Sequence, residues 1–195
     1  MINARRAFKS LREEAKRRQF DAELLEVIQQ ASFRIVAVVI DKLTLRQEYG
    51  DAAAHPYHLA LGFLLQRFAG FLNHINRVGD VMAESRGGTE DRLLAESYTR
   101  VFERGVWMTP AHSFQSALTS RELKLKGKGA NIAGLQLADL LGHPVKQWVL
   151  RQKGLLDEEP APFAEQLMAI VEPKFSRHLC EGKIPGYGYV IYPKK

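Results

Sequence analysis

The feature that most constrains the fold of this chain is a continuous apolar run from Ile35 to Ile40, in which every residue except Ala37 is β-branched. Branched side chains favour extended backbone, and a short unbroken apolar run is typical of a strand covered by helices on both faces. The run is too short to cross a bilayer. We therefore expect a buried strand over residues 33–40 that ends at Asp41-Lys42.

The other apolar residues recur at spacings that indicate further helices and strands. The clearest helical segment runs from Pro56 to Asn76, and Pro56 suits the first helical turn because a missing N–H does no harm there. Gly142 and Pro144 predict a kink in a later helix. In all, we expect helices over residues 1–18, 20–30, 56–76, 89–103, 132–150 and 163–171, and further strands over 78–83, 118–125 and 184–192. This order predicts an α/β fold.

Length and composition indicate the class of protein. A chain of 195 residues fits one compact domain, and 28 Lys and Arg against 22 Asp and Glu give a formal charge of +6. A basic protein favours an anionic partner, and nucleic acid is one candidate. The lone Cys180 has no partner for an internal disulfide, and no signal-peptide pattern follows Arg5 and Arg6. We therefore expect a cytoplasmic protein that does not associate with a membrane.

Three carboxylates stand at positions where ligands are often bound. Asp41 and Glu84 each follow a predicted buried strand, and α/β proteins usually bind ligands beyond the carboxyl ends of strands. Asp139 lies in the most apolar predicted helix, on one stripe with Gln136 and His143. An ionised carboxylate on such a helix needs an exposed position, a cationic partner or a bound cation.

Each strand-end acid also has a purely structural interpretation. In this interpretation, Asp41 pairs with the adjacent Lys42, or both are solvated. Glu84 opens a polar turn in which Arg86 neutralises Glu84 or Glu90. If the acids converge instead, they suit Mg²⁺ or Mn²⁺ and phosphoryl transfer, because such ions prefer carboxylate oxygens and complete their shells with water and phosphate. Arg86 and Lys128 would then contact the substrate phosphate.

A lysine-rich segment follows the predicted strand over 118–125. Lys124, Lys126 and Lys128 alternate, so extended backbone places all three on one face. That face either follows a phosphate backbone or protects an edge strand from aggregation.

Four segments of the chain occur in an informative order. The most specific is Asn131-Ile-Ala-Gly-Leu-Gln-Leu-Ala-Asp-Leu140. Before it come Ile35-Val-Ala-Val-Val-Ile-Asp-Lys42, then Tyr57…Ala60-Leu61…Arg67, then Val81-Met-Ala-Glu-Ser-Arg-Gly87 with Glu90-Asp91. Together they resemble the domain-of-unknown-function 3800 family, over roughly residues 18–151.

This family is similar to the ribonuclease H-like superfold, so the resemblance implies a mixed sheet flanked by helices and a cluster of acids that coordinate Mg²⁺ or Mn²⁺. Carried over by position, it makes Glu84 and Asp139 metal ligands and catalytic residues, with Asp41 a possible third acid. Gln136 and Asn131 match polar residues of the last catalytic helix and of its entry loop, where substrate binds.

The chain departs from the family at its amino end. Members open with a strand that carries Asp-Glu-Ser-Gly, and nothing similar precedes Phe20. We expect a single domain over 1–195 that lacks the first strands, with its core at about 18–151 and a helical and aromatic extension over 152–195. The strand at 35–40 would then keep an open edge for a homodimer or a partner chain.

Two functions follow from these expectations. The first is a metal-dependent nuclease that hydrolyses phosphodiester bonds and that loss of the amino-terminal acidic motif would weaken or inactivate. The second is a non-catalytic module that binds nucleic acid through its basic face or assembles with a partner protein.

Overall fold

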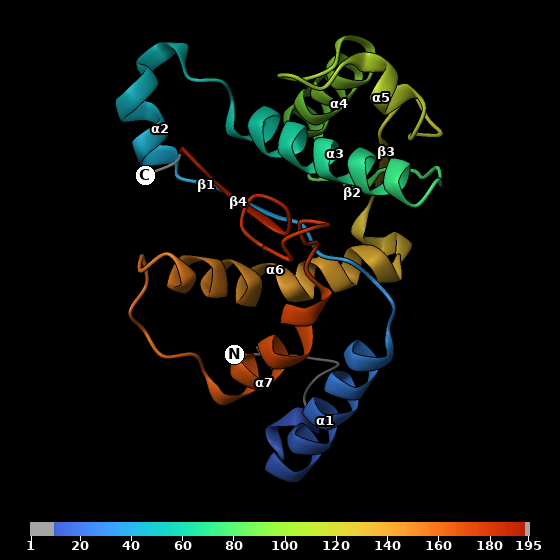
Figure 1. Cartoon of the computed structure of the whole chain (residues 1–195). Helices are drawn as coiled ribbons and strands as arrows, with labels where there is room; N and C mark the ends of the chain where they lie inside the picture. The colour runs from blue at the N-terminus through green and yellow to red at the C-terminus, as the bar shows by residue number, and fades with distance from the viewer. Residues whose placement is uncertain (1–9, 194–195) are drawn as a thin grey trace.

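The computed structural model describes residues 10–193, which form a mixed α/β structure dominated by helices (Figure 1). The helices are α1 (Glu14–Gln30), α2 (Lys42–Tyr49), α3 (Pro56–His74), α4 (Gly88–Arg104), α5 (Ala111–Gln115), α6 (Ala133–Gln152) and α7 (Pro162–Val171). The strands are β1 (Ala37–Ile40), β2 (Met82–Glu84), β3 (Lys124–Lys126) and β4 (Tyr189–Tyr192), and 3-10 turns occur at η2 (Gly50–Ala52), η3 (Lys128–Ala130) and η4 (Glu172–Lys174). The expected α/β class is confirmed. Within residues 10–193, no helix combines the length and apolar character needed to cross a bilayer.

The described strands form two separate parallel pairs, where we expected one mixed sheet. β1 pairs with β4 from Ala37–Tyr189 to Ile40–Tyr192, and β2 pairs with β3 from Met82–Lys124 to Glu84–Lys126. The β1–β4 pair lies between α3 and α6, which both contact β1 (Figure 1). The residues of β1 are only half-buried, not fully buried as expected, because a sheet of two strands is too narrow for its neighbours to enclose.

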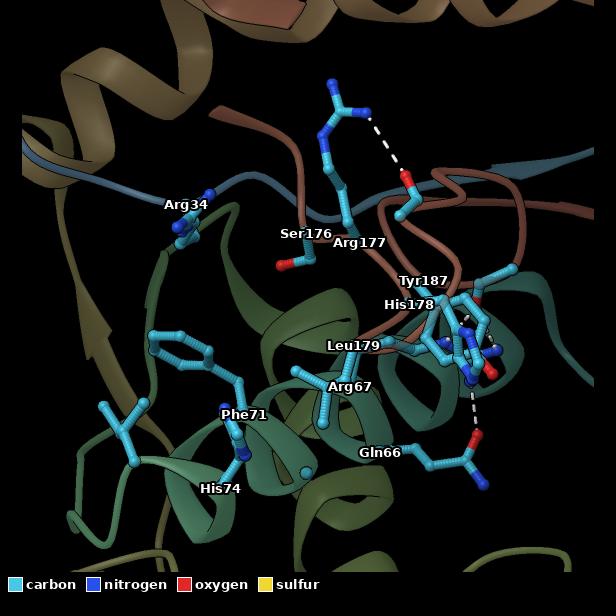
Figure 2. A pocket seen from close by; sticks show the side chains of 14 residues that line it. Arg34, Gln66, Arg67, Phe71, His74, Ser176, Arg177, His178, Leu179 and Tyr187 are labelled. Atoms are coloured by element: carbon cyan, nitrogen blue, oxygen red, sulfur yellow. Dashed lines mark hydrogen bonds between the residues drawn. The ribbon is translucent and has the colours of Figure 1, made fainter. Parts of the chain in front are cut away.

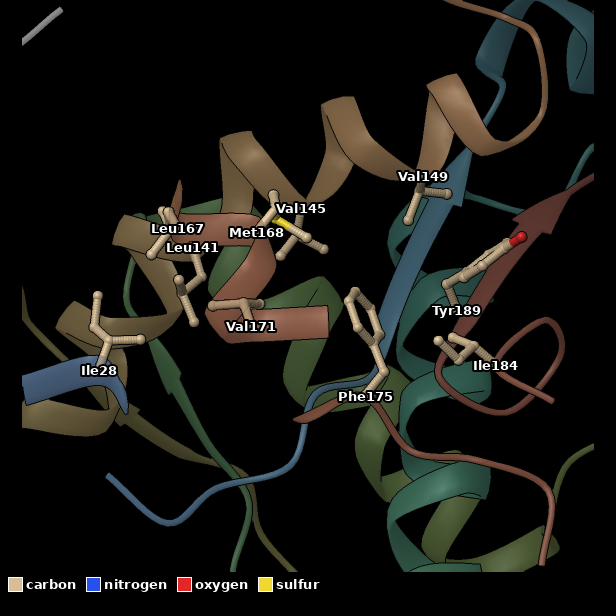
Figure 3. Close-up of a cluster of buried hydrophobic side chains, with 10 residues drawn as sticks. All are labelled: Ile28, Leu141, Val145, Val149, Leu167, Met168, Val171, Phe175, Ile184 and Tyr189. Carbon is tan, nitrogen blue, oxygen red and sulfur yellow. The ribbon is translucent and has the colours of Figure 1, made fainter. Parts of the chain in front are cut away.

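The carboxyl-terminal segment, expected to be an extension, supplies part of the main hydrophobic core. β4 covers one edge of β1, so the chain itself pairs an edge that we expected to be open. Figure 3 shows Val171 of α7, Tyr189 of β4 and Phe175, which follows η4, packed beside Val145 and Val149 of α6. Phe175 and Val149 are completely buried. Residues far beyond 151 therefore belong to the same cluster as α6.

A second core lies between α3, α4, α5 and the β2–β3 pair. Its most deeply buried side chains include Leu65 of α3, Tyr98 of α4 and Phe114 of α5. The Tyr98 hydroxyl donates a hydrogen bond of 2.6 Å to the carbonyl oxygen of Ser120, so this buried polar group is satisfied. α3 thus contributes one face to this core and has a second face toward the β1–β4 side of the molecule.

Several element boundaries differ from those expected. The helices predicted over 1–18 and 20–30 are one continuous helix from Glu14 to Gln30, and residues 1–9 lie outside the described part. No Gly or Pro interrupts 14–30, so extending the helix costs less than starting a new one. The strand expected over 118–125 is reduced to β3, and α6 continues through Pro144.

Candidate functional site

The structure gives Asp41 a clear structural task. It follows β1 and is the N-cap of α2, where its Oδ1 accepts hydrogen bonds of 3.1 Å from the backbone N–H groups of Leu43 and Thr44. Its Oδ2 also accepts a bond of 2.7 Å from the Thr44 hydroxyl. These donors are the ones that a helix leaves unsatisfied in its first turn. The contacts therefore make Asp41 a helix cap, a role that the sequence-based alternatives of pairing with Lys42 or solvation did not include.

We expect Asp41→Ala to lower the free energy of unfolding by about 1 kcal/mol, because the first turn of α2 loses its cap. Asp41→Asn should leave stability close to that of the wild type, since Asn caps helices equally well. Urea unfolding followed by circular dichroism measures both. If Asp41→Asn were as unstable as Asp41→Ala, the carboxylate charge and not the cap would be what matters.

Glu84 and Arg86 lie where β2 turns into α4. Asp91 organises this turn: its carboxylate accepts bonds from the Ser85 hydroxyl at 2.5 Å and from the Arg86 backbone N–H at 2.8 Å. The bond from Ser85, and then that from Arg86, lower the pKa of Asp91 below its ordinary value. Gly87 adopts φ +97°, a value that favours glycine. The Arg86 side chain is exposed and Glu84 is half-buried.

The structure brings four predicted site residues together in two pairs near the start of α6. Lys128 Nζ lies 3.9 Å from the Asp139 carboxylate, and both side chains are largely exposed. Gln136 Nε2 donates a bond of 2.9 Å to Asn131 Oδ1. The Asp139 carboxylate is thus both exposed to solvent and close to a cationic side chain, so its charge needs no bound cation.

The other predicted residues are placed separately. β2, which carries Glu84, contacts α6, which carries Asp139, but within residues 10–193 the ion pair of Asp139 is with Lys128 and not with Glu84. Within the same residues, no group of three or more His, Cys, Asp or Glu side chains is arranged to hold a metal ion. His143 is exposed on α6, with its Nε2 3.4 Å from Gln147 Nε2.

The three alternating lysines do not form one basic face. Lys124 makes an ion pair with Asp80, whose pKa is lowered first by that lysine and then by the Thr119 hydroxyl. Lys128 lies beyond the strand, in η3, because β3 ends at Lys126. The expectation of a continuous strand face is therefore wrong, since β3 stops at Lys126.

A cleft that sequence reasoning did not identify lies between α3 and the loop over residues 176–187 (Figure 2). Its volume is about 880 Å³. Arg67 and His74 of α3 line it from one side, Arg177 and His178 of the loop line it from the other, and Arg34 precedes β1. No carboxylate occurs among the residues that line it. We call this site the basic cleft.

Backbone contacts fix the cations of the basic cleft. Arg67 Nε and Nη2 donate bonds of 3.0 and 2.9 Å to the carbonyl oxygen of Gly186, and Arg177 Nη1 donates one of 3.2 Å to that of Gly182. Burial lowers the pKa of Arg67, an effect that Tyr187 partly opposes, but a guanidinium stays charged at neutral pH. The protein therefore holds positive charge here without neutralising it with acids from the lining.

Aromatic rings and one histidine complete the cleft. The His178 and Tyr187 rings lie 4.6 Å apart, and Phe71 of α3 lies on the opposite side (Figure 2). His178 Nδ1 lies 3.2 Å from the Glu181 backbone nitrogen, within hydrogen-bond distance. The Glu181 carboxylate approaches His178 Nδ1 at 3.5 Å and Lys183 Nζ at 3.0 Å.

One signal in the sequence was available to find the cleft. Gln66, Arg67, Gly70, Phe71 and His74 follow helical spacing of three and four, so they share one face of α3. This face is distinct from the core face that includes Leu65 and Leu72. α3 therefore has two stripes: an apolar one that faces the core and a second one of mixed basic and aromatic residues that lines the cleft.

In comparisons with known proteins, no family model, no curated protein and no solved structure matches this chain significantly. The family resemblance of the sequence therefore stays a prediction.

Proposed function

We propose that this protein binds nucleic acid and that the basic cleft holds part of the phosphate backbone. The observation that carries the proposal is the lining of the cleft, which joins three arginines and two histidines to aromatic rings without a carboxylate. Phosphate contacts by Arg are the main sequence-independent source of affinity for nucleic acid. The formal charge of +6 acts in the same direction at long range.

Two features of the cleft support a phosphate chain over a small neutral ligand. Arg67 and Arg177 have donors oriented by bonds to Gly186 and Gly182, so less side-chain freedom is lost on binding. The cleft is also broad, at about 880 Å³, and it is open to solvent along α3, where Gly70 and His74 are exposed. Such an open basic groove suits a strand that enters and leaves it.

Gly70 offers a sharp test because a Cβ built there meets no atom within 4 Å, and the residue lies in the middle of the cleft face of α3. We expect Gly70→Glu to weaken binding of a labelled single-stranded oligonucleotide by at least about tenfold, because its carboxylate repels phosphate and pairs with Arg67. Gly70→Gln has the same shape without the charge, and it should bind close to the wild type. Fluorescence anisotropy in EDTA at several salt concentrations measures both.

A second substitution tests the charge directly. Arg177→Gln should lower the slope of log affinity against log salt by about 0.7 for a single strand, the value for one lost phosphate contact. Arg18→Gln on α1 removes the same charge from an exposed side chain outside the cleft and is the control. Equal weakening by the two arginine variants, or equal affinity of Gly70→Glu and Gly70→Gln, would place the binding site outside the cleft.

Metal-dependent phosphodiester hydrolysis in a ribonuclease H-like domain of the 3800 family is the second candidate. The observation that favours it is the packing of β2 on α6, which brings the elements of Glu84 and Asp139 into contact. Arg86, Lys128, Asn131 and Gln136 would then position the substrate beside Mg²⁺ or Mn²⁺. The same oligonucleotides incubated with Mn²⁺ separate the candidates: cleavage that Asp139→Asn abolishes supports the nuclease, and binding without cleavage supports the binding module.

A further inference from the structure

A line of four aromatic rings lies beside the basic cleft. Trp107 stacks on Phe63 with ring centroids 4.2 Å apart, Phe63 lies 5.5 Å from Tyr192, and Tyr192 lies 6.5 Å from Tyr49. The rings come from four parts of the chain: the turn over 106–109, α3, β4 and α2. We call these four residues the aromatic row. Tertiary structure alone places them side by side.

The aromatic row is exposed at both ends. Trp107 is 52% exposed and Tyr49 is 45% exposed, although rings of this size usually hide most of their surface. Phe63 and Tyr192, between them, are half-buried. The Tyr192 hydroxyl donates a bond of 3.3 Å to that of Tyr49, which fixes the two phenol rings relative to each other. The row is an ordered surface and not a set of loose side chains.

The turn that carries Trp107 holds the indole at the surface. Val106 and Thr109 exchange backbone hydrogen bonds of 3.0 and 2.9 Å, and Trp107 adopts φ +48°, an unfavourable value for a bulky residue. Strain of this kind is concentrated at functional positions, where neighbouring structure compensates for it. Stacking on Phe63 covers one face of the Trp107 ring and holds it in place, while the residue stays 52% exposed.

Two contacts join the aromatic row to the basic cleft. The Arg67 guanidinium, which lines the cleft, lies over the Phe63 ring at 5.4 Å from its centroid. Gln66, also in the cleft, donates a bond of 2.7 Å to the Thr109 hydroxyl in the turn of Trp107. The cations of the basic cleft are therefore continuous with the aromatic row, whose exposed residues are Trp107 and Tyr49 at its two ends.

We propose that the exposed ends of the aromatic row, Trp107 and Tyr49, stack unpaired bases of a single-stranded nucleic acid whose phosphates lie in the basic cleft, which gives preference over duplex. This inference rests on the proposed function and adds the strand specificity. Every base has a flat face that an aromatic side chain can cover, and in a duplex those faces are already covered by neighbouring bases. A basic groove beside exposed aromatic rings is the usual arrangement for sequence-tolerant binding of single strands.

The test compares two anionic probes, of which only one has bases: a labelled single-stranded 12-nucleotide DNA and inorganic polyphosphate. Loss of one stacked base should weaken binding of the single strand to Trp107→Ala by about 5- to 150-fold and leave polyphosphate binding unchanged. Trp107→Phe should restore part of the affinity because it keeps a ring. Tyr49→Ala, at the other end of the row, should weaken binding of the single strand and leave polyphosphate binding unchanged. It replaces Trp107→Ala in the test if that variant is unstable.

Met108 supplies the matched control, because it is 96% exposed in the same turn and has no ring. Met108→Ala should bind both probes as the wild type does. The stacking role would be overturned if the wild type bound single strand and duplex with equal affinity. It would also be overturned if Trp107→Ala lost equal affinity for the single strand and for polyphosphate; in both cases the cleft would remain a polyanion site. Absence of binding of either probe to the wild type would instead overturn the proposed function. Self-association that Trp107→Ala abolishes would assign the row to a protein interface.

Discussion

Phe175→Ala is expected to lower the free energy of unfolding by about 3–5 kcal/mol, a large part of the stability of a domain of this size. Phe175 is completely buried, and its ring stacks on that of Trp148 with centroids 5.0 Å apart. Its backbone neighbours also pair with the chain before β1, since Ser176 N–H donates to Ile35 O at 2.9 Å. Truncation therefore opens a cavity where α6, α7 and the β1–β4 pair meet (Figure 3).

Urea unfolding monitored by circular dichroism gives the midpoint and the slope from which this loss is calculated. The control is Leu179→Ala, which removes an apolar side chain from the same segment at a position that is 70% exposed. We expect Leu179→Ala to change stability by no more than about 0.5 kcal/mol. A loss below about 1 kcal/mol for Phe175→Ala would mean that the segment after residue 151 is separate from the core, as the sequence first suggested.

Gly105→Ala is expected to cost about 3 kcal/mol or more, from two effects that add. Gly105 ends α4 with φ +74° and ψ −174°, a conformation that is essentially restricted to glycine. An added Cβ would also lie 2.9 Å from the Ala111 backbone nitrogen and still closer to the Thr109 carbonyl oxygen. Because backbone atoms surround the site, the turn over 106–109 must move to accept the methyl group.

The displaced turn gives Gly105→Ala a second measurable effect. We expect a change in the fluorescence of Trp107, because its stacking on Phe63 depends on that turn. Gly127→Ala is the control: Gly127 has φ −66°, and no atom lies within 4 Å of its added Cβ. It should leave stability unchanged or raise it by about 0.4–1 kcal/mol. Similar unfolding midpoints for the two variants would contradict the crowding at Gly105.

Local patterns in the sequence predicted most of the secondary structure because the forces behind them are local. The spacing of apolar residues placed α3 within two residues at its carboxyl end, and Pro56 marked its first turn. The β-branched run at 35–40 likewise predicted β1. The failures were the short helices α2 and α5, which the sequence patterns did not predict, and the boundaries of α1, where nothing local distinguishes one long helix from two short ones.

Candidate site residues were harder to predict because a carboxylate has the same side chain in a helix cap, an ion pair and a metal site. Asp41 and Asp139 were chosen for their positions at element ends and on an apolar helix. The contacts show Asp41 capping α2 and Asp139 beside Lys128. Gln136 and Asn131 were chosen through the family resemblance, and the structure joins them by a hydrogen bond from Gln136 Nε2 to Asn131 Oδ1.

By itself, the sequence determined that this chain forms an α/β protein with a net positive charge, because period and composition act along the chain without reference to distant residues. Only the tertiary structure decided where that charge and the aromatic rings meet. Arg34, Arg67 and Arg177 are brought to one cleft when residues after 171 fold back over β1 and α3. Contacts across more than a hundred residues depend on packing, which no local pattern encodes.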